Sequence, residues 1–116
     1  MPVNVDFVAV TLGTAAFSTA TFSSHSATCD TPTGVLTTES ETTAAGSSQT
    51  YTVVCAAAAN TDAIFVSVAN VLNTQGTPVV GRVEFVPTGF QIVLLNIHAS
   101  QAFNGTLKLR YTIIKA

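Results

Sequence analysis

Charged residues are scarce in this sequence. Only four Lys or Arg and six Asp or Glu occur among 116 residues, and all four cations lie after residue 81. Proteins that bind nucleic acid present clusters of cations to the phosphate backbone, and no such cluster occurs here. Because the net charge is also −2, the composition predicts that nucleic acid is not a partner.

Long apolar runs and an export signal are lacking as well. The apolar stretches have about the length of a strand, whereas a membrane-spanning helix needs about 20 consecutive apolar residues. The N-terminus has no basic residue ahead of an apolar segment, and it places Asp6 where such a segment would begin. We therefore expect a protein that is made in the cytoplasm without a signal peptide and does not bind a membrane.

Hydroxyl residues supply much of the polar character that charges do not. The chain has 19 Thr and 9 Ser, and 47% of its residues are hydrophobic. Thr and Val favour strands, and the residues that favour helices, such as Leu, Lys and Glu, are few. A chain of this length fits one domain with one core. We therefore expect a single all-β domain over residues 1–116.

Alternating apolar and polar residues mark the expected strands, and Gly, Pro and Asn mark the turns between them. The clearest alternation lies at residues 107–115. Asn104-Gly105, just before it, favours a type I′ turn, and residues 56–62 suit a crossover. The pattern predicts an antiparallel β-sandwich, jelly-roll-like, with seven or eight short strands. These strands are expected at 3–12, 15–24, 35–38, 50–55, 64–71, 79–86, 90–97 and 107–115.

The residues that could carry catalysis form no recognisable motif. His25 and His98 could act as bases, but no Gly-x-Ser-x-Gly segment supplies a nucleophile. Glu39 and Glu41 could form a carboxylate pair, but they lie in the polar stretch 39–48, which reads as a surface loop with solvated acids. The sequence therefore predicts that the protein is not an enzyme and has no cofactor.

The two cysteines allow two interpretations. With His25 and His98 they could supply the ligands of a zinc site, but they lack the short Cys-x-x-Cys spacing of structural zinc sites, so no metal is expected. Cys29 and Cys55 could form one disulfide, or both could be small buried residues with free thiols.

Stacking platforms for sugars are few, because the chain has no Trp and only two Tyr.

Six short segments after Cys29 are distinctive. They are TTES (37–40), TTAAG (42–46), DAIFVSVAN (62–70), GTPVV (76–80), NIHAS (96–100) and NGTL (104–107). In these strand and turn segments the chain resembles a loose family of small β-rich virion structural proteins of tailed bacteriophages, of the decoration (cement) or fibre type. The residues before position 25 share less with that family, so residues 1–24 are a candidate docking or edge-strand segment.

The resemblance implies a place on the virion and a role in assembly. The function expected first is a capsid decoration protein, a homo-oligomer and most simply a trimer, that contacts the major capsid protein or another virion protein. The alternatives are a head or tail fibre domain that binds the host surface and, third, a carbohydrate-binding module. The residues expected at assembly contacts are Val3, Val5, Phe7, Lys108, Arg110 and Lys115.

Overall fold

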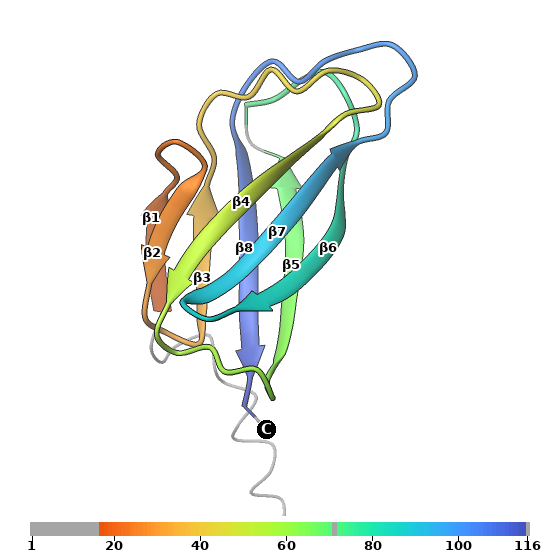
Figure 1. The fold of residues 1–116 in the computed structure, drawn as a ribbon. Coiled ribbons are helices and arrows are strands. Elements are labelled where there is room, and N and C mark those ends of the chain that lie inside the picture. The colour runs from red at the N-terminus through yellow and green to blue at the C-terminus, as the bar shows by residue number, and fades with distance from the viewer. Residues whose placement is uncertain (1–16, 71, 116) are drawn as a thin grey trace, which may run out of the picture.

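A computed structural model describes residues 17–70 and 72–115 of the chain. These residues form eight strands and no helix, so the all-β prediction is confirmed (Figure 1). The strands are β1 (Phe17–Thr21), β2 (Ser26–Cys29), β3 (Thr33–Thr37), β4 (Ser48–Cys55), β5 (Ala63–Asn70), β6 (Pro78–Val86), β7 (Gly89–Asn96) and β8 (Leu107–Ile114).

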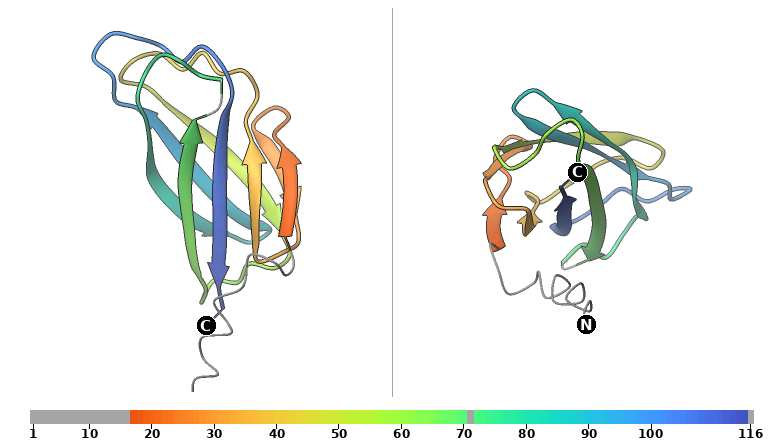
Figure 2. Two further views of the ribbon diagram at one scale, coloured as in Figure 1. Left: turned by 180° about the vertical axis from the view of Figure 1, so that it is seen from behind. Right: turned by 90° about the horizontal axis from the view of Figure 1, so that it is seen from below.

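The strands form two four-stranded sheets that face each other, as Figures 1 and 2 show from three sides. Sheet A has the order β1-β3-β8-β5, and sheet B has the order β2-β4-β7-β6. The arrangement is that of a β-sandwich. Strand β8 is central in sheet A, and the strands at the sheet edges are β1, β2, β5 and β6.

The prediction that neighbouring strands are antiparallel is wrong at two places. Strand β1 pairs with β3 in parallel, and β2 pairs with β4 in parallel. The reason is that the chain crosses to the other sheet after β1, after β2 and after β3. Strands β1 and β3 therefore run in the same direction in sheet A, and β2 and β4 do so in sheet B. The other strand pairs are antiparallel. The jelly-roll-like connection stays a prediction.

The core lies between the sheets and follows the alternation expected from the sequence. Every second residue of β8 is buried, which confirms the two faces predicted for residues 107–115. In sheet B, buried residues alternate with more exposed ones in the same way over residues 51–55 of β4 and 90–96 of β7. The buried apolar side chains of these three strands are Tyr51, Val53, Cys55, Phe90, Ile92, Leu94, Leu107, Leu109, Tyr111 and Ile113.

The predicted turns are confirmed in one case and wrong in another. Residues 87 and 88 connect β6 and β7 as a hairpin, as expected. Asn104 and Gly105 do not form a type I′ turn, because neither has a positive φ. The Asn104 side chain instead accepts hydrogen bonds from the backbone N–H groups of Thr74 and Gln75, at 2.7 and 3.2 Å.

The N-terminal part of the chain differs most from the prediction. The strand expected at 15–24 is the shorter β1, and β2 was not predicted. Between them Ser24 and His25 have φ angles of 51° and 60°, a left-handed conformation that few residues other than Gly adopt. The strand expected at 3–12, with Val3, Val5 and Phe7, lies outside the described residues.

Candidate functional site

Lys108 and Arg110, two of the residues expected at assembly contacts, lie together on the outer face of sheet A. Both alternate with the buried residues of β8, so their side chains point away from the core. Within residues 17–70 and 72–115, neither forms an ion pair. Within the described part of the chain, their charges are therefore not balanced by a neighbouring acid.

Lys115 has a different environment. Its Nζ donates hydrogen bonds to the carbonyl of Ala57, at 2.5 Å, and to Oδ2 of Asp62, at 2.6 Å. The Asp62 side chain is almost fully buried. Lys115 therefore fixes the segment between β4 and β5 to the end of β8, and it contributes mainly within the chain.

The outer face of sheet A also carries large apolar side chains. Phe65 on β5 is 59% exposed and Ile114 on β8 is 52% exposed. Phe65 lies opposite Thr112, and the neighbouring row pairs Ser67 with Arg110. The residues that the pairing places on this face are Thr19, Thr21, Thr33, Val35, Thr37, Ala63, Phe65, Ser67, Ala69, Lys108, Arg110, Thr112 and Ile114. None of them is acidic.

The edge of sheet A at β5 lacks the features that protect most edge strands. Strand β5 has eight residues, AIFVSVAN, with no charge and no Pro, and no described strand pairs with its outer side. The other edges are short, as in β1 and β2, or are interrupted, as in β6, which begins at Pro78, has a bulge between Val80 and Arg82 and carries two charges. An unprotected edge of this length favours pairing with another chain.

Cys29 and Cys55 are neighbours across the parallel pair of β2 and β4. They are direct partners in the strand register, both are buried, and both thiols are free in this structure. Burial, together with a hydrogen bond to Cys55, raises the pKa of Cys29 to about 12. The structure thus has the free-thiol alternative of the sequence prediction, while the register brings the two residues as close as a disulfide would need.

We expect the two thiols to react slowly with an alkylating reagent in the folded protein. At pH 8 the Cys29 thiol, with a pKa of about 12, is a thiolate about once in ten thousand molecules, and burial restricts the access of the reagent to both thiols. Mass spectrometry after timed iodoacetamide treatment measures this rate. Labelling in denaturant is the control and should modify both residues within minutes. Equally fast labelling in the two conditions would contradict the prediction, and no labelling in denaturant would indicate a disulfide.

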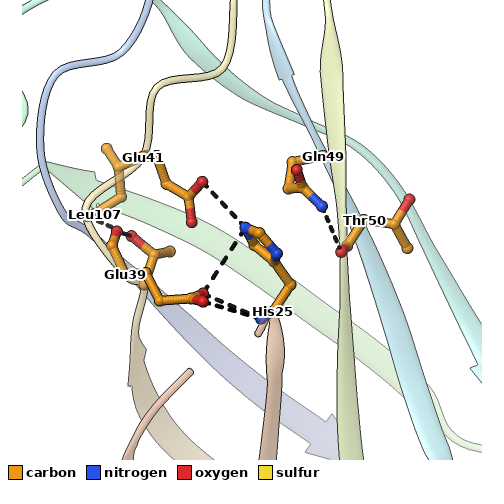
Figure 3. Close-up of polar contacts among 7 residues, drawn as sticks. His25, Glu39, Glu41, Gln49, Thr50 and Leu107 are labelled. Atoms are coloured by element: carbon orange, nitrogen blue, oxygen red, sulfur yellow. Dashed lines mark hydrogen bonds and ion pairs between the residues drawn. The ribbon is translucent and has the colours of Figure 1, made fainter. Parts of the chain in front are cut away.

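A polar pocket lies at the opposite end of β2 from these cysteines, where His25 meets the segment that follows β3. Both carboxylate oxygens of Glu39 accept a hydrogen bond from the His25 backbone N–H, at 3.2 Å each. The imidazole Nε2 lies 3.2 Å from Oε1 of Glu41 and 3.8 Å from Oε1 of Glu39 (Figure 3). The left-handed turn at Ser24 and His25 directs both the ring and the N–H group of His25 toward these acids.

The structure corrects the prediction that both acids of this pocket are solvated. Glu41 is not a solvated loop acid, because only 4% of its surface is exposed. Its N–H donates to the carbonyl of Gly105 at 2.9 Å, which fixes the segment after β3 to the one before β8 and draws the side chain inward. Glu39 keeps about a third of its side chain exposed. The pocket has a volume of about 330 Å³, and the rest of its lining consists of Ala44 and of six hydroxyl or amide residues: Ser40, Thr42, Thr43, Ser47, Ser48 and Gln49.

Among the described residues, two buried oxygens beside the pocket make no hydrogen bond of ordinary geometry, although they belong to side chains that interact with each other. They are Oε2 of Glu41 and the hydroxyl of Tyr51. Burial, with the nearby carboxylate of Glu41, raises the pKa of Tyr51, so its phenol stays neutral. Buried polar atoms without a partner are rare in folded proteins, because each costs about 1–3 kcal/mol. These two atoms make the pocket an unusual polar environment.

The other histidine does not join this cluster. Nδ1 of His98 accepts hydrogen bonds from the N–H groups of Ser100 and Gln101, at 3.0 Å each, and so stabilises the loop after β7. The cysteines also lie outside the cluster of possible ligands, which contains His25, Glu39 and Glu41. Little in the sequence indicated that His25, Glu39 and Glu41 lie together, because β2 and β3 separate His25 from the two acids along the chain.

Two further observations bear on function. None of the described residues belongs to a helix that is long and apolar enough to cross a bilayer. Comparison of the chain with family models, with curated proteins and with solved structures gives no match.

Proposed function

We propose that the chain is a structural protein of a phage virion, most simply a capsid decoration protein that works by self-association and by contact with the capsid. The observation that carries the assembly role is the long, uncharged edge at β5 beside the exposed Phe65. The virion role rests on the resemblance of the segments after Cys29 to phage structural proteins. The proposed role needs no active site and no cofactor.

The contacts follow from the chemistry of sheet A. A second copy of the chain can add a strand to β5, because the free N–H and C=O groups of an edge strand pair with any extended backbone. Phe65 and Ile114 would bury apolar surface around that contact. Lys108 and Arg110, which have no acidic neighbour among the described residues of their face, would meet acidic groups of the capsid subunit.

Self-association is tested by replacing Phe65 with Lys. An aromatic side chain buried in an interface contributes about 2 kcal/mol, so the variant should weaken association about 30-fold. Ile97→Lys is the matched control, because Ile97 is 60% exposed but follows β7 in the other sheet. Native mass spectrometry over a range of concentrations should show oligomers, most simply trimers, for the original chain and for Ile97→Lys, and a monomer for Phe65→Lys.

Capsid binding is tested separately by co-sedimentation with shells that lack the protein. Retention of the original chain and loss of binding in a Lys108→Glu, Arg110→Glu variant would support the decoration role. An original chain that stays monomeric and does not sediment with the shells would contradict it. That result would favour the alternative in which the domain belongs to a fibre that contacts the host.

A further inference from the structure

We propose that His25, Glu39 and Glu41 form a binding site for a divalent transition-metal ion, with Zn²⁺ as the best fit. The site is independent of the assembly role. The three residues each offer one ligand atom, and these atoms all lie within 4.8 Å of one another. They come from two segments that are distant in sequence, the turn before β2 and the stretch after β3.

The donor set fits zinc better than calcium or magnesium. One imidazole nitrogen and two carboxylate oxygens are ligands that Zn²⁺ accepts at about 2.0–2.2 Å, whereas Ca²⁺ and Mg²⁺ prefer oxygen ligands alone. Two ligands of a tetrahedral ion at that distance lie about 3.3 Å apart. The distance between Nε2 of His25 and Oε1 of Glu41 is 3.2 Å, so these two atoms already have the required separation.

The charge balance of the pocket also favours a cation. Two carboxylates converge on one imidazole, and among the described residues no Lys or Arg forms an ion pair with either acid. The Glu41 side chain is 95% buried, and its Oε2 makes no hydrogen bond of ordinary geometry with a described residue, although the Tyr51 hydroxyl lies close enough to interact with this carboxylate. A buried carboxylate oxygen without a partner is costly. Because a ligating imidazole is neutral, a bound divalent ion would balance the negative charges of both carboxylates, and both oxygens of Glu41 could chelate it.

The backbone of the turn holds His25 in place for this role. Ser24 and His25 both adopt the left-handed conformation, which is sparsely populated for residues other than Gly and concentrates at functional sites. The two hydrogen bonds from the His25 N–H to Glu39 fix one ligand against another. Three protein ligands leave one coordination position open toward the hydroxyl-lined pocket, where water can bind.

Zn²⁺ titration of the full chain after EDTA treatment tests the proposal. Isothermal titration calorimetry should show one ion per chain, and Zn²⁺ should raise the melting temperature. His25→Asn, in which Asn tolerates the left-handed backbone, and Glu41→Gln should each weaken binding by more than about tenfold. Glu84→Gln is the matched control, since Glu84 is an exposed acid on β6 that pairs with Arg82.

Co²⁺ distinguishes this site from the cysteine pair. Bound to nitrogen and oxygen ligands, Co²⁺ should give visible d–d absorption without a thiolate charge-transfer band, and Cys29→Ala, Cys55→Ala should keep the spectrum. Glu39→Gln, whose side chain is partly exposed, provides a variant with little risk to folding. The proposal is overturned if no ion binds, if the cysteine variant abolishes binding, or if folded His25→Asn and Glu39→Gln proteins bind Zn²⁺ like the original chain.

Discussion

Replacing Asn96 with Ala is expected to destabilise the protein by about 4 kcal/mol, because the Asn96 side chain satisfies four backbone groups inside the structure. Its Nδ2 donates to the carbonyls of Thr43 and Gln101, at 3.1 and 2.8 Å. Its Oδ1 accepts from the N–H groups of Thr77 and His98, at 3.0 and 3.1 Å. The residue is 1% exposed, so water cannot replace these bonds in an unchanged structure.

Urea unfolding followed by circular dichroism measures this loss. A difference of that size corresponds to a fall in melting temperature of roughly 15 °C or more for a domain of this length. Asn96→Asp keeps the shape but places a carboxylate against two carbonyls, so it should be about as harmful. Asn60→Ala, at an exposed loop position, is the control and should change stability by less than about 0.5 kcal/mol. A loss below about 1 kcal/mol for Asn96→Ala would contradict the structural role.

Raising the pH from 9 to 11 is expected to remove several kcal/mol of stability. Burial raises the pKa of Cys29 from 9.0 to about 12 and also raises the pKa of Tyr51 and of Tyr111 above their ordinary value of 10.0. The unfolded chain therefore loses these protons at a lower pH than the folded chain. The stability that they contribute is fully present below about pH 9 and is lost by about 1.4 kcal/mol per pH unit, for Cys29 above pH 9 and for each tyrosine above pH 10.

Urea titrations at pH 8, 9, 10 and 11 measure this dependence. Tyr51→Phe is the informative variant, because it removes one titrating group and also a hydroxyl that has no hydrogen-bond partner. The variant should be at least as stable as the original chain at pH 8 and should lose stability less steeply above pH 10. A free energy of unfolding that stays constant up to pH 11 would contradict the assigned pKa directions.

Strong alternation made the later strands predictable. In β8 large apolar residues alternate with polar ones, and β6 and β7 flank a Pro-Thr-Gly turn, so both elements follow from local sequence. Strand β2 was missed because its inward residues, Ala27 and Cys29, are small and give a weak apolar signal. The parallel pairs were missed because local alternation does not tell which sheet a strand enters.

The candidate site was less predictable than the fold. His25, Glu39 and Glu41 are each present in the sequence without a motif, and their meeting depends on the left-handed turn at residue 25 and on the bridge from Glu41 to Gly105. The neighbouring positions of Cys29 and Cys55 depend on the register of a strand that the sequence did not predict. The exposed face of β8 was predicted correctly, because the alternation of apolar and polar residues in this strand is enough to place Lys108 and Arg110 on its outer side.

The central place of β8 has a consequence for how the chain matures during synthesis. Residues 63–70 have no partner strand, and residues 33–37 have only β1, until residues 107–114 have left the ribosome, because β8 joins β3 to β5. Contacts between residues so distant in sequence form slowly. Until then the apolar strand β5 stays unpaired on both sides, so neighbouring nascent chains on one message can pair with either of its edges.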